Sequence, residues 1–291
     1  MSTLSQFVGA FSSQQTIVDI LIVGGGGGAD SLTSAQAYAA GGGGAGQLVY
    51  LSQFPIATGI SLVVTVGAGG ASATSGNQSS LGPLLVAAGG GPGSTQTWGN
   101  HGIRGPLGEG SSGGYSSNQS SKTMFDVYPL PSTSALFYLP SNPRQSVRIA
   151  ANKGGSQFGD QYNSGVSGAG GGAGGVGGTS TGGSITPSGG LGLSFDITGT
   201  NTTYAEGAAG RTQAGGTQAG VAGTANTGNG GRGGMNATSV AQPGGNGGSG
   251  VVIIAYRDTL PAPAAISGTY DTPSRSGYRV YRFTGSGSIT F

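Results

Sequence analysis

The chain of 291 residues contains no cysteine, which excludes disulfide bonds and thiolate metal sites. Because secreted proteins often carry disulfides, this absence favours assembly in a reducing compartment. Only 7% of the residues are charged, and 11 basic residues nearly balance 9 acidic ones, for a formal net charge of +2. Since lysine and arginine form no cluster, the sequence predicts no binding to nucleic acid.

The composition also argues against disorder and against a collagen fold. Disordered chains combine low hydrophobicity with high net charge, whereas 35% of this chain is hydrophobic and its net charge is small. Collagen needs glycine at every third position and abundant proline, but the 66 glycines are irregularly spaced and the prolines number 13. The apolar segment 17–23 is short and contains Asp19. We therefore expect no membrane insertion and no signal peptide.

The hydrophobic pattern predicts short β-strands separated by turn residues, with almost no helical periodicity. Only 31–40 has room for one or two helical turns, between glycine runs. Short strands at irregular spacing fit a mainly-β fold of the sandwich or jelly-roll type. The expected strands are 17–23, 47–51, 60–66, 84–88, 191–197 and 250–256.

Near the C-terminus, 278–284 and 288–291 predict a hairpin joined by the turn 285–287. Alternation gives the first strand two faces, each with apolar groups and one arginine. This mixture favours the edge of a sheet or a subunit boundary over a buried centre. The residues of the two faces are Tyr278, Val280 and Arg282, and Arg279, Tyr281 and Phe283.

Glycine tracts with a period of three residues occur at 229–235 (NGGRGGM) and 243–249 (PGGNGGS), and less regularly at 168–178 (GAGGGAGGVGG). A polyproline-II helix has three residues per turn, so an x-Gly-Gly repeat puts its side chains on one edge and leaves two edges bare. Bare edges let neighbouring backbones approach closely, and buried helices of this kind must bond laterally to one another. The tracts predict a bundle of polyglycine-II helices held by the β-strands. The alternative is a set of unrelated loops.

No constellation for catalysis, metal binding or cofactor binding is recognisable in the sequence. A single histidine, His101, and the lack of cysteine argue against a zinc site. The strand 17–23 and its following glycines lack the βαβ unit that a dinucleotide site requires. The acidic residues are scattered, with no evident pair for glycoside cleavage. We therefore expect a protein that is not an enzyme and uses no cofactor.

Four motifs in a particular order resemble the glycine-rich domain of bacteriophage tail-fibre and other virion proteins. The resemblance covers roughly 17–256 and implies a tumour-necrosis-factor-like sandwich with inserted glycine helices, in a virion appendage. The motifs are VDILIV at 18–23 followed by the glycines 24–28, LVVTVGAGG at 62–70, the glycine field 223–234, and GSGVVII at 248–254.

The chain departs from the family pattern at its C-terminus. A segment like 281–291 usually precedes the first long strand in the family, but here it ends the chain. We expect the C-terminal hairpin to fill the missing strand position, in its own subunit or in a neighbouring one. The predicted organisation is a glycine-rich sandwich domain at 1–256, with an aromatic insert at about 93–164, and a C-terminal linker and hairpin at 257–291.

The aromatic insert is the second departure and the predicted place of recognition. Aromatic side chains with Asn, Gln and Ser nearby suit stacking against sugar rings or contact with a protein partner. A small satellite core or a subunit contact would explain the same residues. The candidate receptor or partner contacts are Trp98, His101, Tyr115, Tyr128, Tyr138 and Tyr162.

These expectations lead to a bacteriophage virion structural protein, a homotrimeric tail-fibre or adhesin component that contacts the host cell surface. Weak sites on exposed loops would add through avidity on a rigid scaffold. Its partners would be other virion proteins and a host surface glycan or protein. The alternative is a decoration or connector protein of the virion that contacts no receptor. A polysaccharide-cleaving enzyme is a third class, which a sugar-release assay would detect.

Overall fold

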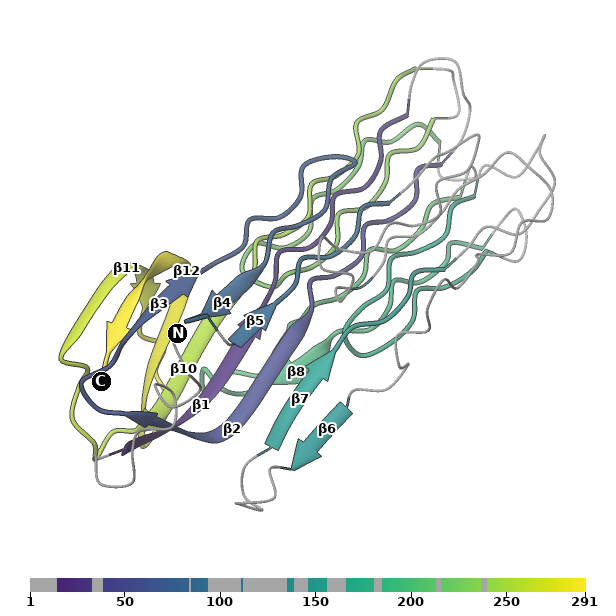
Figure 1. The fold of residues 1–291 in the computed structure, drawn as a ribbon. Helices are drawn as coiled ribbons and strands as arrows, with labels where there is room; N and C mark the ends of the chain where they lie inside the picture. The colour runs from purple at the N-terminus through teal and green to yellow at the C-terminus, as the bar shows by residue number, and fades with distance from the viewer. Residues whose placement is uncertain are drawn as a thin grey trace.

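The computed structural model describes residues 15–32, 39–83, 85–93, 111, 135–138, 146–155, 166–180, 185–212, 216–236 and 240–291. Within these ranges the regular elements are all β-strands, and no helix occurs. Figure 1 shows an elongated molecule. The long strands are gathered at one end, and the glycine-rich segments run side by side away from them.

The strands form one ten-stranded sheet, which curls into half a barrel, and a separate two-stranded hairpin (Figure 1). The order in the large sheet is β5-β4-β3-β12-β10-β1-β2-β7-β6, with β11 also paired to β12, and the hairpin is β8-β9. The bounds are β1 Gln15–Val23, β2 Leu48–Ala57, β3 Ser61–Thr65, β4 Ser79–Leu81, β5 Leu85–Ala87, β6 Ala135–Tyr138, β7 Ser146–Ala150, β8 Leu193–Phe195, β9 Thr202–Tyr204, β10 Val251–Arg257, β11 Ala265–Asp271 and β12 Tyr278–Thr290.

The mainly-β prediction is confirmed, and each expected strand between 17 and 256 overlaps an observed one. β2 extends beyond its predicted end through Pro55. Its outer edge is paired with β7 only over Leu48–Ser52, so the missing amide of Pro55 breaks no ladder there. The strands β4, β6, β7, β9 and β11 were not among the expected strands. β4 and β9 are short and mostly polar, whereas β6 is apolar but has only four residues.

The central strands are buried on both faces over Ile20–Val23 of β1 and Val251–Tyr256 of β10, which explains why these stretches read as continuous apolar runs. One face points into the curl and forms the larger core. The other face is covered by the β8-β9 hairpin. Residues of the larger core include Ile20, Ile22, Leu51, Val252, Ile254, Tyr281 and Phe283. Residues of the second core include Leu21, Val23, Leu48, Ile253, Val280 and, from the hairpin region, Ile197 and Tyr204.

The predicted C-terminal hairpin is wrong, because Tyr278–Thr290 is one continuous strand of 13 residues. Its first half pairs with β10 and its second half with β3, so β12 lies inside the sheet and not at an edge. Gly287 marks a close approach and not a turn, since a Cβ there would lie 2.1 Å from the carbonyl oxygen of Ser267. The predicted alternation is right: Val280 faces the second core, and Tyr281 and Phe283 face the larger one. Within this chain, β12 occupies the position between β10 and β3.

The glycine-rich segments bond sideways to several neighbours, with a repeat of three residues. The buried segment 24–29, which follows β1, shows the pattern. Every third amide donates to the same neighbouring segment, at 2.8–3.0 Å. The pairs are Gly24 and Gly27 to Gln47 and Gly44, Gly25 and Gly28 to Asn77 and Thr74, and Gly26 and Ala29 to Gly248 and Gly245. Because no bond closes within the segment, its order depends on these neighbours.

The carbonyl groups of the same segment accept from further neighbours. Gly25 and Gly28 accept from the amides of Gly90 and Gly93, at 2.8 and 3.0 Å. Packing is so close that a Cβ at Gly25 would lie 2.1 Å from the carbonyl oxygen of Ala68. Only glycine satisfies such an approach. The interior around 24–29 is therefore built mainly from backbone groups.

Candidate functional site: a groove in the glycine-rich part

Most of the predicted contact residues lie outside the described ranges. These residues are Trp98, His101, Tyr115, Tyr128 and Tyr162. Tyr138 is the last residue of β6 and pairs with Ser146 of β7. Their role in recognition stays a prediction.

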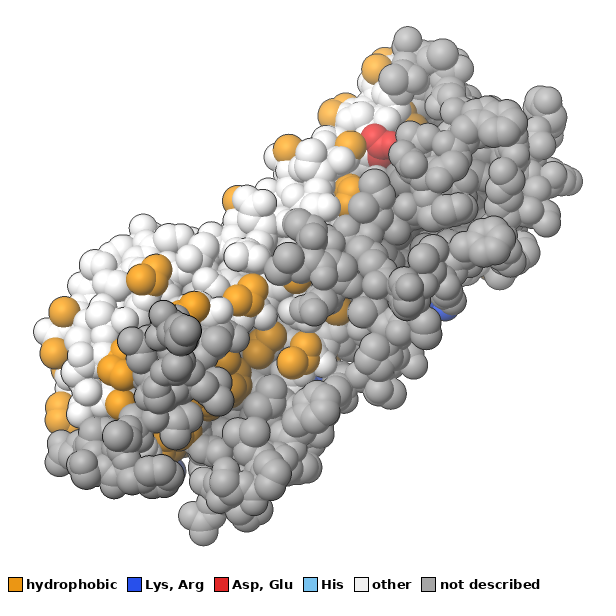
Figure 2. Space-filling view, viewed as in Figure 1, with side chains coloured by type: hydrophobic (Ala, Val, Ile, Leu, Met, Phe, Trp, Pro, Cys, Tyr) orange, Lys and Arg blue, Asp and Glu red, His pale blue; other side chains and the backbone are white. Residues whose placement is uncertain are grey.

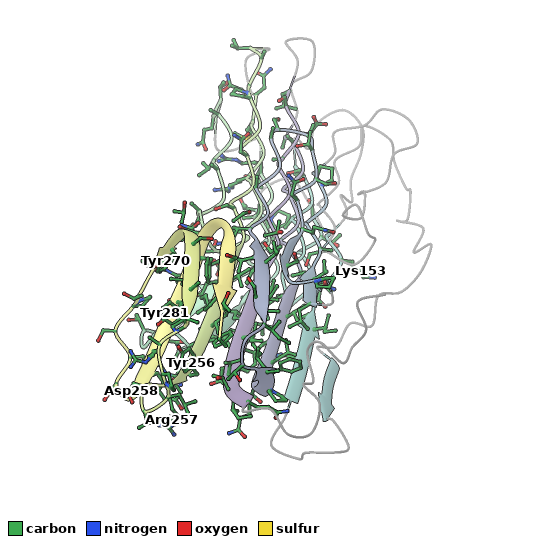
Figure 3. All side chains as sticks on the ribbon, turned by 60° about the vertical axis from the view of Figure 1, so that its left-hand side comes forward. Lys153, Tyr256, Arg257, Asp258, Tyr270 and Tyr281 are labelled. Atoms are coloured by element: carbon green, nitrogen blue, oxygen red, sulfur yellow. The ribbon has the colours of Figure 1, made fainter. Side chains whose placement is uncertain are left out.

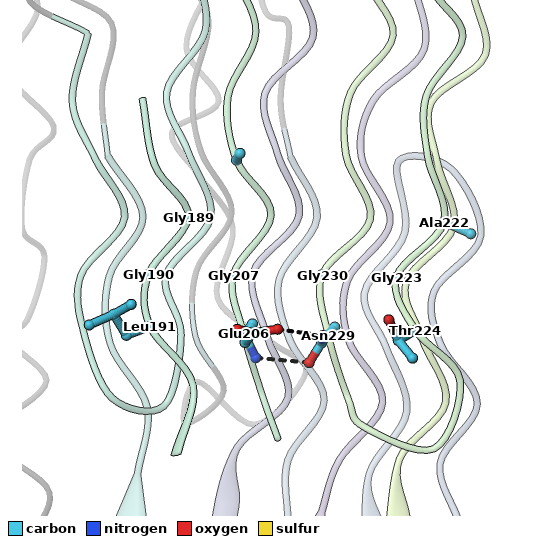
Figure 4. Close-up of a pocket in the computed structure, with 11 residues that line it drawn as sticks. Gly189, Gly190, Leu191, Glu206, Gly207, Ala222, Gly223, Thr224, Asn229 and Gly230 are labelled. Atoms are coloured by element: carbon cyan, nitrogen blue, oxygen red, sulfur yellow. Dashed lines mark hydrogen bonds between the residues drawn. The ribbon is translucent and has the colours of Figure 1, made fainter. Parts of the chain in front are cut away.

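The described residues form a groove of about 310 Å³ on the glycine-rich part. Residues 189–191 lie along one side of it and 222–224 along the other, with 206–209 and 229–230 between them (Figure 4). The four segments are distant in sequence and are brought together by lateral backbone bonds, such as the one from Gly230 N to Glu206 O at 2.9 Å. The described residues that line the groove include no aromatic side chain and no arginine or lysine.

The most polar feature of the groove is the pair Glu206 and Asn229 (Figure 4). The amide of Glu206 donates to Asn229 Oδ1 at 2.9 Å, and Asn229 Nδ2 donates to Glu206 Oε2 at 3.1 Å. Asn229 is the first residue of the x-Gly-Gly tract 229–235. Its side chain satisfies an amide that has no backbone acceptor at this position. The pair fixes two segments and places a carboxylate at the surface.

Several amides that line the groove have no protein acceptor within the described part of the chain. They belong to Gly189, Leu191, Ala209, Ala222 and Thr224. Exposed amides of this kind are normally hydrated, or they bond to a ligand. The groove therefore offers hydrogen-bonding backbone groups and one carboxylate, groups that can bind a ligand by hydrogen bonds.

Outside the groove, two arginines link neighbouring glycine segments by hydrogen bonds to backbone carbonyl groups. Arg211 is buried, and its Nε and Nη2 donate to the carbonyl oxygens of Gly233 and Ala219 at 2.9 and 3.0 Å. Arg232 donates through Nε and Nη2 to Gly210 O at 3.3 and 3.2 Å. Burial lowers the pKa of both guanidinium groups, and that of Arg211 is lowered further by Arg232. Carbonyl oxygens, rather than carboxylates, compensate these charges in the described residues.

A second cluster of charges lies at the end of the sheet remote from the glycine segments, where Figure 3 labels Arg257. The ring of Tyr278 has the guanidinium carbons of Arg275 and Arg257 at 3.8 and 4.6 Å from its centroid. Nη1 of Arg275 also lies 4.0 Å from Asp19 Oδ2. Burial, followed by the charge of Asp19, raises the pKa of Tyr50 to about 12. These contacts join β1, β10 and β12, so the charged cluster has a structural role in holding these strands together.

Exposed hydrophobic side chains are unevenly distributed over the described residues. On the face seen in Figure 2, hydrophobic side chains gather over the sheet end and are scattered elsewhere. Leu191, at 72% exposure, and Ile185, at 68%, are exposed aliphatic residues of the glycine-rich part. Single exposed aliphatic residues are common on soluble proteins. Among the described residues, no group of three or more His, Asp or Glu side chains could hold a metal ion.

The described residues also contain no helix long and apolar enough to cross a membrane.

Sequence reasoning identified the tract that contains Asn229 but not the groove. The groove depends on which segments become neighbours, and the glycine spacing does not specify this. Its one sequence signal is the polar residue at the x position of an x-Gly-Gly repeat.

A family model described as a glycine-rich domain matches residues 2–257. Comparisons with curated proteins and with solved structures gave no match.

Proposed function

The chain belongs to the glycine-rich domain family, and from this premise we propose that it is a structural protein of a bacteriophage virion. It would serve as a tail-fibre or adhesin component at the host cell surface. The observation that carries the proposal is the glycine-rich part itself, where backbone bonds in several directions hold a buried and nearly uncharged interior. Such an interior gives a stiff projection, which a virion appendage needs.

We propose further that the glycine segments are polyglycine-II helices inserted into a jelly-roll or tumour-necrosis-factor-like sandwich. Two features support this geometry. The direction of the amides repeats every third residue, as in a helix with three residues per turn. The glycine Cβ positions are also blocked by neighbouring carbonyl oxygens, as at Gly26, where Asn229 O would be 2.1 Å away.

In this proposal the active form is a homotrimer within a larger virion assembly. Three copies would present the aromatic insert to a host glycan or protein, so that weak contacts gain from avidity. Trp98, His101, Tyr115, Tyr128, Tyr138 and Tyr162 are the proposed contacts. Sedimentation velocity of the purified chain measures its oligomeric state, and a monomer at micromolar concentration would contradict the trimer.

The alternative function is a decoration or connector protein of the virion that binds no receptor. The lateral bonds of the glycine segments are equally suited to this role, because it also requires rigidity.

Antibody labelling of purified phage particles, followed by electron microscopy, tests the proposed location. Label on a tail fibre or another appendage is expected, and particles that lack the protein would contradict the virion assignment. Binding of purified protein to host cells then separates the two roles. Cell binding supports the adhesin, whereas stable docking to particles without cell binding supports the decoration or connector.

A further inference from the structure

The groove between 189–191 and 222–224 lies where one more backbone segment would continue the lateral packing. On the segment 205–211, the amides of Gly207 and Gly210 donate to the neighbouring segment at Gly190 O and Pro187 O. The amides of Glu206 and Ala209 precede these two by one residue and are likewise three residues apart. The first donates to the Asn229 side chain, and the second donates to no acceptor in the described residues.

The segment that carries 222–224, along one side of the groove, repeats this arrangement. Along 218–224, the amides of Gly220 and Gly223 donate to Pro243 O and Asn246 O at 2.8 Å. Ala222 lies between these bonded positions and lines the groove, and its amide has no acceptor within the described part of the chain. Both segments therefore present unpaired backbone amides to the groove. Elsewhere in the described glycine-rich part, amides at equivalent positions donate to a neighbouring segment.

The closeness of the existing neighbours limits the kind of chain that fits. A Cβ at Gly207 would lie 2.1 Å from Gly170 O, and one at Gly223 would lie 2.2 Å from Asn229 O. A segment packed against the groove at the same spacing must present glycine at its contact edges. An x-Gly-Gly repeat does so, since its side chains all lie on one edge and can face solvent.

The x-Gly-Gly tracts of this chain are already engaged. In 229–235, Gly230 donates to Glu206 O and Gly231 to Gly27 O. In 243–249, Gly247 donates to Gly70 O and Gly248 to Asn229 O. A sugar is a poorer fit, because no aromatic ring on which a sugar could stack stands among the described lining residues. The occupant that the backbone groups favour is thus a glycine-rich segment of another polypeptide.

We propose that this groove binds an extended x-Gly-Gly segment of a partner protein, which adds one more backbone to the glycine-rich part. The main-chain bonds would resemble those by which a peptide adds a strand to a sheet edge. The inference goes beyond the proposed virion role, since it concerns what the groove binds and holds wherever the protein acts.

Binding of a fluorescent peptide to the full chain, measured by anisotropy, tests the proposal. The probe is a soluble synthetic peptide of repeated Gly-Gly-Asn triplets, and its control has alanine in place of every glycine. Ala209→Pro and Ala222→Pro each remove one unpaired amide and place a ring in the groove. Proline is compatible with an extended three-residue helix, so both variants should fold, which thermal melts verify.

Ala219→Pro is the matched control, because Ala219 is three residues before Ala222, is exposed and has an unpaired amide outside the groove. We expect the glycine peptide to bind and the alanine peptide not to bind. Each groove variant should weaken binding by roughly tenfold, with Ala219→Pro unchanged. The proposal is overturned if the glycine peptide does not bind, if the alanine peptide binds equally well, or if neither folded groove variant weakens binding. Self-association of the chain that both groove variants abolish, without peptide binding, would assign the groove to a second copy and overturn it too.

Discussion

The amide of Gly26 donates to the carbonyl oxygen of Gly248 at 2.9 Å, although the two residues are near opposite ends of the glycine-rich domain in the sequence. The two backbones also approach closely at the next residue: a Cβ built on Gly247 would lie 2.0 Å from Gly26 O. Similar contacts surround the whole segment 24–29. Its glycines are thus held by distant parts of the chain and form a packed interior.

Gly26→Ala should destabilise the protein by ~3 kcal/mol or more, because its Cβ would lie 2.1 Å from Asn229 O and backbone cannot yield cheaply. Gly175→Ala is the matched control, since the nearest atom to its Cβ is 3.5 Å away. Urea denaturation of both variants measures the difference. Equal stabilities for the two would show that the close packing at Gly26 is absent in solution.

Arg211→Ala should cost ~3 kcal/mol, since it leaves the carbonyl oxygens of Gly233 and Ala219 without their donors in a buried place. Arg282→Ala provides the comparison. Arg282 forms an ion pair with Asp271 in which both side chains are more than a third exposed, so its loss should cost less than ~1 kcal/mol. The same urea experiment distinguishes them. An Arg211 variant as stable as the Arg282 variant would refute the fastening role.

Deleting 278–291 should abolish folding. The strand β12 pairs with β10, β3 and β11, so its loss leaves the larger core open and exposes the edges of three strands. Far-ultraviolet circular dichroism and gel filtration measure the outcome. A soluble, cooperatively melting truncated protein would contradict the position of β12 in its own chain.

Stability should fall as the pH rises between 10 and about 12, in part through Tyr50. Its pKa is about 12 in the folded chain and 10 in the unfolded chain, mainly because of burial. The unfolded chain therefore loses its proton first, and the stabilising contribution that is complete below pH 10 is lost as the folded pKa is passed. Thermal melts of the native protein and of Tyr50→Phe should show a shallower decline in the variant. Parallel declines would contradict the partly buried position of Tyr50 against the second core.

The sequence predicted the sheet well where apolar residues are continuous. The stretches 20–23 and 250–256 are buried on both faces, and no polar alternation obscures them. It failed at Gly285 and Gly287, because a glycine inside a strand and a glycine in a turn look the same without the neighbouring strand. Here Gly285 and Gly287 face Thr269 and Ser267 of β11 at close range.

The glycine-rich part was predictable in kind but not in arrangement. The period of three at 229–235 indicated bare edges and lateral bonding, and bonds such as Gly231 N to Gly27 O supply partners on those edges. The sheet decides which glycine-rich segments become neighbours, because each segment begins and ends at particular strands. The groove with Glu206 and Asn229 depends on these meetings, and its one sequence signal is the polar residue Asn229 at the start of an x-Gly-Gly repeat.

Amide hydrogen exchange at 24–28, followed by nuclear magnetic resonance, tests most directly whether the glycines form a packed interior. If they do, these amides exchange only through opening of the whole domain, with protection close to that of Ile253 and Ile254 in β10. Exchange at the rate of an unstructured peptide, while β10 stays protected, would contradict the account.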